Sequence, residues 1–457
     1  MIASKKVNLL DLTAGSVLAA LVLLIGGVIA YINLLGVMVT MRSVNPTSQI
    51  SPYETLTLTF SQPVRPNDVE NQLQVQPSVP VRLEWQDDHT VHVTPIRPYQ
   101  GNLMVHLVPG RIGADGTWLR KDLTWTFTVR PPKIIYWNYA DPQRELMVVP
   151  VKGGSPRQLT FTGGEIYDFA VSPSGDSIAY SVLNDQKGID LWIIDRNGKE
   201  PRKLLDCGTG QCTTPAWSPD GKLIAYDYQA PGLTADSAPG APRPWIVEFE
   251  TGNKHPVFSD PQTIGYGALW SPDGNWLASY DGVSNKIRVV NLQSGKQVEL
   301  PSTLGNLGSW SPDSEYLLFP NNVVNEDNTT TTTLDRADFI SGEVGVFMGK
   351  PSDHEDYMYG SPAWSPSGDQ IAVSLRPDPQ NPERQLWVFR PETLGGPMIG
   401  TDAGFTYDYY QWDPWGTGLV LQQANLKKVF APEAAVWFPM TGKTVIAEDA
   451  MFPHWLP

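Results

Sequence analysis

Tyrosines and acidic residues recur together in short segments that separate apolar stretches of the chain. The first segment contains Tyr167 and Asp168, and the second contains Tyr266. The third runs from Asp353 to Tyr359 and the fourth from Tyr407 to Tyr410. Tyrosine offers a rigid contact area with a polar tip, and carboxylates attract cations or basic side chains. If the fold gathers these segments, they form a surface that recognises a protein, peptide or glycan.

A second interpretation of the same residues stays open. Each tyrosine could pack against its neighbouring strand, with the acids simply solvated. His354 lies between Asp353 and Glu355, so it could act as a general base or hold a cation, although a lone histidine in an acidic loop is more often just exposed. The candidate binding residues are Tyr167, Asp168, Tyr266, Asp353, His354, Tyr357, Tyr359, Tyr407, Asp408 and Tyr409.

Sequence signatures of enzymes are absent. The chain has no Gly-x-Ser-x-Gly, His-Glu-x-x-His, P-loop or Gly-x-Gly-x-x-Gly motif. We therefore expect no catalytic residue, no cofactor and no metal site. The alternative is a lyase or glycosidase that uses acids such as Asp168, Asp353 and Asp408, which would need two carboxyl groups about 5–10 Å apart, with a raised pKa.

The only two cysteines, Cys207 and Cys212, lie five positions apart with two glycines between them. A disulfide is plausible if this part of the chain lies outside the cytoplasm. Two free thiols are the alternative, and a metal site is disfavoured because no other ligand cluster lies nearby.

The N-terminal region has the pattern of a membrane anchor. No charged side chain occurs from Leu12 to Met41, which is 30 residues, and a bilayer core needs about 20. Lys5 and Lys6 precede this run and Arg42 follows it, so residues 1–11 should stay cytoplasmic. We expect a single-pass membrane protein with a transmembrane helix over residues 12–41 and the bulk of the chain outside the cytoplasm. A cleaved signal peptide is the alternative, but its apolar core is normally 7–15 residues.

Residues 43–130 alternate between apolar and polar side chains in short runs, which predicts about seven strands of a β-sandwich. The sequence Phe60-Ser61-Gln62-Pro63-Val64 resembles the signature of bacterial Ig-like domains of the S-layer-protein type. The resemblance continues through Thr94-Pro95, Asp115-Gly116 and Thr126-Phe127-Thr128. It implies a spacer or an adhesive module.

One motif recurs through the remainder. Its second copy reads Trp217-Ser218-Pro219-Asp220-Gly221. The six copies begin at Val171, Trp217, Trp270, Trp310, Trp364 and Trp412. The spacings between successive copies are 46, 53, 40, 54 and 48 residues. Periods of 40–50 residues indicate a β-propeller with one blade per repeat. Proline presets the first central position of a tight turn, and Asp-Gly completes it.

A seventh repeat is split between the two ends of residues 133–457. The strand Leu146–Val149 and its turn have no inner strand before them, while Pro453-His454-Trp455 echoes Pro215-Ala216-Trp217. We therefore predict a seven-bladed propeller closed by the C-terminal strand. The repeats look like the TolB-type propeller family, which implies an extracytoplasmic binding domain. Six blades are the alternative, because many members of that family have six.

The propeller pattern places the candidate residues on one face. The Ser-Pro-Asp-Gly turns join strands one and two on one side, so the loops between blades lie on the other side, together with three long inserts. Long loops grouped on one face commonly carry binding. The formal net charge of −15 argues against nucleic acid as a partner. The favoured function is a membrane-anchored binding or scaffold protein, with the enzyme above or an accessory subunit of a larger membrane complex as alternatives.

Overall fold

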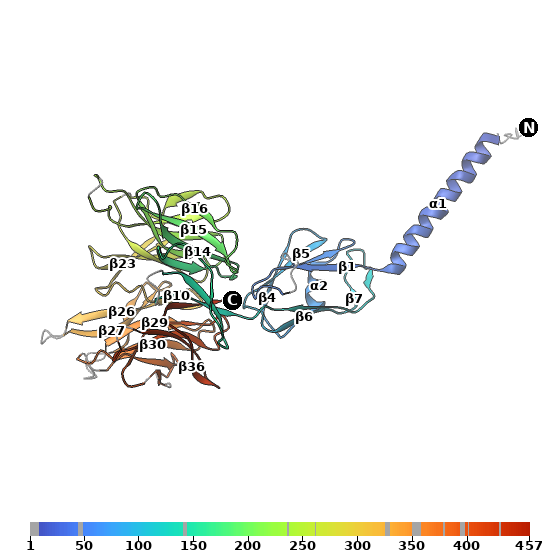
Figure 1. Cartoon of the computed structure of the whole chain (residues 1–457). Helices are drawn as coiled ribbons and strands as arrows, with labels where there is room; N and C mark the ends of the chain where they lie inside the picture. The colour runs from blue at the N-terminus through green and yellow to red at the C-terminus, as the bar shows by residue number, and fades with distance from the viewer. Residues whose placement is uncertain are drawn as a thin grey trace, which may run out of the picture. The chain divides into compact units, whose positions relative to one another are not determined.

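The computed structural model describes residues 9–43, 49–139, 144–234, 237–260, 262–324, 330–349, 358–377, 380–393, 398–400, 402–428 and 431–457. Side chains are not described at 9–12, 28–30, 32–35 and 398. The chain divides into two compact units, Met1–Arg130 and Pro131–Pro457 (Figure 1).

Helix α1 (Leu9–Leu35) opens unit 1. It is shorter than the helix that the sequence predicts over 12–41, because the backbone turns at Gly36, whose φ is +72°. Strand β1 (Val39–Ser43) then pairs with β2 (Leu56–Phe60), so the last residues of the predicted span belong to a sheet. In the described part of the chain, no helix is long and apolar enough to cross a membrane. The anchor therefore stays a prediction.

The rest of unit 1 consists of two main sheets around one core. One sheet has the order β1-β2-β5-β4 and the other the order β3-β6-β9, with a separate pair β7-β8. Buried side chains of both sheets, such as Leu58, Val93 and Val105, form a single cluster. The remaining elements are α2 (Pro66–Gln72), β3 (Leu73–Gln76), β4 (Val81–Trp85), β5 (Thr90–Pro95), β6 (Asn102–Leu107), β7 (Gly110–Arg111), β8 (Trp118–Leu119) and β9 (Leu123–Thr128).

Unit 2 is built from antiparallel sheets whose strands follow the chain order. The strands before the third Trp motif are β10 (Lys133–Asn138), β11 (Leu146–Pro150), β12 (Arg157–Gln158), β13 (Ile166–Val171), β14 (Ser177–Leu183), β15 (Ile189–Asp195), β16 (Arg202–Leu205), β17 (Gln211–Trp217), β18 (Leu223–Gln229), β19 (Arg243–Glu248) and β20 (Lys254–Pro256). The later strands are β21 (Tyr266–Trp270), β22 (Trp276–Asp281), β23 (Lys286–Asn291), β24 (Gln297–Pro301), β25 (Ser309–Trp310), β26 (Tyr316–Val324), β27 (Thr330–Asp338), β28 (Val344–Met348), β29 (Met358–Trp364), β30 (Ile371–Arg376), β31 (Gln385–Phe389), β32 (Met398–Gly400), β33 (Phe405–Trp412), β34 (Leu419–Asn425), β35 (Pro432–Phe438), β36 (Gly442–Glu448) and β37 (Ala450–Leu456).

These strands form four-stranded groups: β21–β24, β25–β28, β29–β32 and β33–β36. A longer sheet contains β13–β20 and divides at one parallel pair, Ile189↔Gln211, into two further groups. The last group has the order β12-β11-β10-β37, so the C-terminal strand lies beside a strand more than 300 residues earlier in the chain (Figure 1).

The tryptophan of the repeated motif joins neighbouring groups. In five described copies its indole N–H donates to the backbone carbonyl of the residue one position before the motif in the preceding inner strand, whereas the indole nitrogen of Trp364 is buried without a hydrogen-bond partner. Trp270 donates to Ala216 at 3.0 Å and Trp412 to Ala363 at 2.9 Å. The same bond occurs at Trp217, Trp310 and Trp455. A buried indole N–H needs a partner, so this position specifies both packing and register.

The Ser-Pro-Asp-Gly segments are hydrogen-bonded turns. In the second copy, the Ser218 hydroxyl accepts the Leu223 amide at 2.9 Å and donates to the Asp220 carboxylate at 2.6 Å. Gly221 has a φ of +70°, a backbone conformation that favours glycine. The chemistry of the turn therefore explains the repeated sequence.

Candidate functional site

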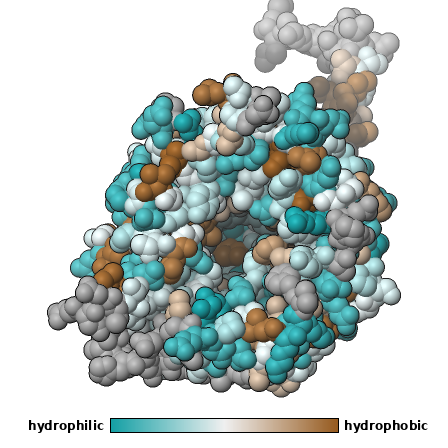
Figure 2. Space-filling view, turned by 60° about the vertical axis from the view of Figure 1, so that its left-hand side comes forward, coloured by the Kyte–Doolittle hydropathy of each residue, from teal (hydrophilic) through white to brown (hydrophobic). Residues whose placement is uncertain are grey.

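The inner strands of unit 2 share an irregularity near their start. The register of β13, β17, β21, β29 and β33 shifts against the next strand within the five residues before the motif position. Such bulges redirect side chains. The space-filling view shows a face of the propeller that is hollowed at its centre (Figure 2). We call this hollow the channel.

Three of the predicted residues are accessible at equivalent positions of their inner strands, four residues before the motif position. Tyr167 is 47% exposed and Tyr266 is 43% exposed. Asp408 is exposed as well, and its carboxylate forms an ion pair with Arg384 at 3.2 Å. We call Tyr167, Tyr266 and Asp408 the mouth residues.

Two predicted residues are buried and cannot offer a contact surface. Tyr359 is 9% exposed and packs among apolar side chains such as Val373. Tyr407 is fully buried, and its hydroxyl bonds to Asp402 and Lys443. For these two, burial fits the alternative interpretation, in which the tyrosine packs against a neighbouring strand. Asp353, His354 and Tyr357 lie outside the described residues.

Asp168 and Asp227, in neighbouring four-stranded groups, are both desolvated acids. Burial raises the pKa of Asp168 to about 6 and that of Asp227 to about 7, and the Asp168 charge adds to the second shift. One Asp227 oxygen, Oδ2, accepts the Gly267 amide at 2.8 Å and the Thr214 hydroxyl. The other, Oδ1, is buried without a hydrogen-bond partner. No positive charge contributes to either pKa shift.

The contact of Asp227 with Gly267 has a counterpart elsewhere in the ring. Gln422 occupies the equivalent strand position in its own sheet, and its side-chain oxygen accepts the Phe452 amide at 2.8 Å. A neutral amide therefore satisfies a bulged inner strand as well as a carboxyl group does. Accepting the amide of the next inner strand therefore does not require the negative charge that Asp227 can carry.

Tyr409, Gln411 and His454 form a hydrogen-bonded chain, and the charge of Asp168 acts on its tyrosine. The Tyr409 hydroxyl lies 2.6 Å from His454 Nε2 and accepts the Gln411 side-chain amide at 3.0 Å. Burial lowers the pKa of His454 to about 4, so its ring is neutral near pH 7. Tyr409 then donates to Nε2, since its oxygen already accepts from Gln411. Burial, with the Asp168 charge second, raises the pKa of Tyr409, which keeps its hydroxyl protonated.

Sequence reasoning missed Asp227, Gln411 and His454. Asp227 follows four apolar or aromatic residues in β18, and an acid in such a strand was a usable signal. His454 lies within the segment that echoes Pro215-Ala216-Trp217, where other copies have alanine, leucine, serine or glutamine before the motif position. We call Asp168, Asp227, Tyr409, Gln411 and His454 the channel cluster, a name that refers to the inner strands that carry four of them.

Cys207, in the loop between β16 and β17, forms a disulfide with Cys212 near the start of β17. The loop is also held by Asp190, whose carboxylate accepts the Cys207 amide at 2.9 Å and pairs with Lys203 at 2.7 Å. In unit 1, the described residues Asp87, Asp88 and His89 bring three potential ligand atoms within 4.8 Å of one another. The two acids are exposed, and such groups are common on protein surfaces without a metal.

No family model matches the chain. The uncharacterized protein YidR of Escherichia coli K12 is 28% identical over 142 residues, which are 29% of this chain and 32% of that protein. Dipeptidyl-peptidase 5 of Porphyromonas endodontalis is 35% identical over 74 residues, which are 15% of this chain and 11% of that protein. The chain therefore matches about a third and about a tenth of the length of these two curated relatives.

Solved structures resemble the chain at low identity. One from a study of two prolyl endopeptidases has a TM-score of 0.50 at 14% identity and covers 78% of this chain and 48% of that one. TolB from Acinetobacter baumannii has a TM-score of 0.41 at 14% identity and covers 84% and 83%. The β-propeller domain of the trilobed protease from Pyrococcus furiosus has 0.48 at 13% and covers 77% and 96%. Likeness at this identity shows the fold alone: the chain is an all-β protein with a β-propeller.

Proposed function

We propose that this chain is a membrane-anchored extracytoplasmic binding protein whose propeller recognises a protein, peptide or glycan partner at the channel mouth. In this proposal the propeller has seven blades, and an Ig-like domain stands between it and the anchor. The division of the described sheets of unit 2 into seven four-stranded groups supports the blade count. The two sheets around one core in unit 1 support the Ig-like assignment.

The anchor in this proposal is α1. Every side chain of α1 that the structure describes is exposed, including Leu18, Leu21 and Leu24. An exposed row of large apolar side chains is unfavourable in water and favourable in lipid. The charge asymmetry around the apolar run supports a cytoplasmic N-terminus.

The observation that carries the binding proposal is the pair of desolvated acids, Asp168 and Asp227. Neither has a cationic partner that would lower its pKa. A basic group of a partner that entered the channel would stabilise both carboxylates, while the mouth residues Tyr167 and Tyr266 supplied contact area. The favoured partner therefore carries a lysine, arginine or other organic cation at its point of contact.

The test compares full-length chains recovered from membranes with the anchor intact. Replacing Tyr167, Tyr266 and Asp408 with alanine should remove the co-purified partner. The matched control replaces Ile340 and Met440, which are 73% and 95% exposed on turns between outer strands, and should retain it. If both variants recover the same amount of partner, the proposal is wrong.

The acid pair also favours a second function, a lyase or glycosidase, because two coupled carboxyl groups with raised pKa values can divide the roles of acid and base. Turnover of neutral or uronic-acid oligosaccharides by the wild-type chain, lost in Asp168→Asn and in Asp227→Asn, would support it. An absence of turnover across both substrate types would remove it.

A further inference from the structure

Strand β4 is an edge strand in unit 1. It ends the sheet β1-β2-β5-β4, and its other neighbour in the chain, β3, is the edge of the opposite sheet. The Gln86 amide donates to Thr90 and the Ile96 amide donates to Pro80, so the even-numbered positions along β4 face β5. The backbone groups of Val81, Leu83 and Trp85 consequently point away from the sheet, toward an unoccupied edge.

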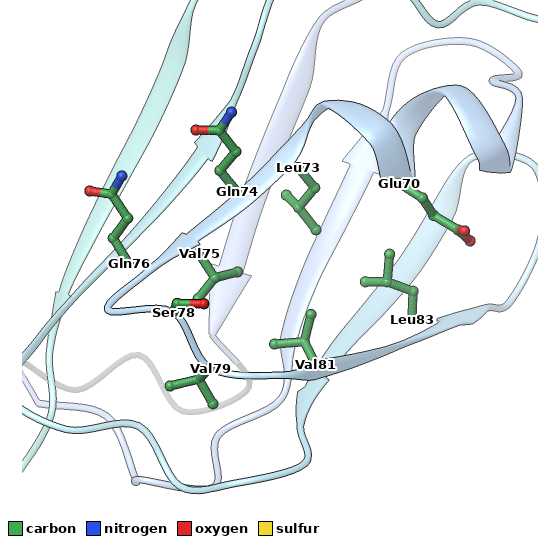
Figure 3. Close-up of a pocket in the computed structure, with 9 residues that line it drawn as sticks. All are labelled: Glu70, Leu73, Gln74, Val75, Gln76, Ser78, Val79, Val81 and Leu83. Carbon is green, nitrogen blue, oxygen red and sulfur yellow. The ribbon is translucent and has the colours of Figure 1, made fainter.

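The two edge strands border an open cavity of about 560 Å³, which both apolar and polar side chains line. Leu73 and Val75 of β3 point into it from one side, and Val81 and Leu83 of β4 from the other (Figure 3). Val79, in the connection between the two strands, lines its end. All five side chains are only partly buried, although they pack against the core.

The exposed side chains of β4 are self-complementary in charge. Arg82 and Glu84 alternate with the inward-facing Val81, Leu83 and Trp85. Edge strands that must stay single commonly carry charges that repel another strand. Here, an antiparallel second copy of β4 centred on Leu83 would place each Arg82 opposite a Glu84, with two such pairs per interface.

We propose that β4 pairs with β4 of a second copy of this chain, about a two-fold axis at Leu83. In this register Val81 lies opposite Trp85 of the other copy, and Leu83 lies opposite its own counterpart. All three residues have a backbone N–H, so the outward donors and acceptors of both strands are satisfied. The apolar side chains of each added strand point to the cavity side, because paired residues share a face of the sheet. The interface is isologous and closes as a dimer.

Paired charge reversals test this register in the full-length chain in detergent. Arg82→Glu should weaken self-association by about tenfold or more, because each pair becomes acid against acid. Glu84→Arg should do the same with two basic pairs. A mixture of the two variants should associate again, since every pair is then opposite in sign. Lys121→Glu, exposed in the same unit, makes the same change in net charge and should have no effect.

Disulfide trapping supplies a second measurement for a weak dimer. Leu83→Cys should cross-link two chains, because hydrogen-bonded antiparallel partners have Cα atoms about 5.5 Å apart, within disulfide range. Arg82→Cys should not, since it faces position 84 of the other copy. The proposal is wrong if the wild-type chain is a monomer, or if its dimer is unaffected by both charge reversals. It is also wrong if the mixture of variants fails to associate, or if position 82 cross-links instead of position 83. Dimerisation through α1 would show as the second of these outcomes.

Discussion

Asp227 is a carboxyl group that the fold keeps away from water while satisfying only one of its oxygens. In the folded chain its pKa is about 7, against an ordinary value of 3.8, because burial penalises the charged form. His454 has the opposite response, since burial lowers its pKa to about 4. Between pH 4 and 6.5 the folded chain binds extra protons at Asp168 and Asp227, whereas the unfolded chain binds the extra proton at His454. The two kinds of site therefore give pH dependences of stability that oppose each other.

Replacing Asp227 with asparagine should change how stability depends on pH. In the wild-type chain, this acid favours folding less as pH rises from about 4 to 7, because the folded state must then lose a proton that it holds more tightly than the unfolded state. Asparagine keeps an acceptor for the Gly267 amide and does not titrate. From pH 4 to pH 8, the free energy of unfolding of Asp227→Asn should improve relative to wild type by about 1–4 kcal/mol. Chemical unfolding at both pH values measures this, and parallel pH profiles would contradict it.

Tyr409→Phe should destabilise the propeller by about 1–3 kcal/mol, because it removes the hydroxyl that bonds to His454 Nε2 and Gln411 and leaves their polar atoms without that partner. Tyr266→Phe is the matched control, since its ring is 43% exposed and its change should stay within about 0.5 kcal/mol. Thermal unfolding followed by near-ultraviolet circular dichroism compares the two variants. If the two variants lower the unfolding temperature equally, the hydrogen-bonded chain does not stabilise the propeller.

At the scale of single strands, the repeated tryptophan is the feature that holds one sheet to the next. Trp270→Phe should cost about 1–2 kcal/mol, since it removes the hydrogen bond to Ala216 and part of the packing. Trp364 provides the control, because its indole nitrogen is buried without a hydrogen-bond partner. Trp364→Phe should therefore cost less. If Trp364→Phe costs as much or more, packing and not the indole hydrogen bond accounts for the motif.

The propeller fold was predictable because its determinants are local and repeated. Each Trp-Ser-Pro-Asp-Gly copy encodes its own turn, as the bonds of Ser218 and Gly221 show. The candidate site was only partly predictable. Tyr167 and Tyr407 both precede an aspartate near the start of an inner strand, yet Tyr167 lies at the bulge and is exposed, whereas Tyr407 lies just before the bulge and is buried. Asp227 acquires its raised pKa from burial, and the charge of Asp168 on another strand adds to it, a non-local environment that the sequence does not display.

At the scale of the whole molecule, the ring in unit 2 depends on pairing between β10 and β37. Ile134 pairs with Trp455, and Trp455 also donates to Gln411 of the preceding inner strand. The C-terminal strand therefore contacts two sheets at once, and each of these contacts is long-range in sequence. Without it, β10 would present an unpaired edge next to the channel cluster, which would also lose His454.

Supplying β37 as a separate peptide tests how much of the ring it holds. A chain truncated after Asp449 should unfold at a lower temperature and aggregate more readily, because β10 is left unpaired. A synthetic peptide of residues 450–457 should raise the unfolding temperature in proportion to the logarithm of its concentration above its dissociation constant. A peptide with Trp455→Ala should act only at higher concentration, since it lacks the indole that reaches Gln411. If the truncated chain matches the full-length chain in unfolding temperature, or if both peptides act equally, closure by β37 does not contribute to the stability of the propeller.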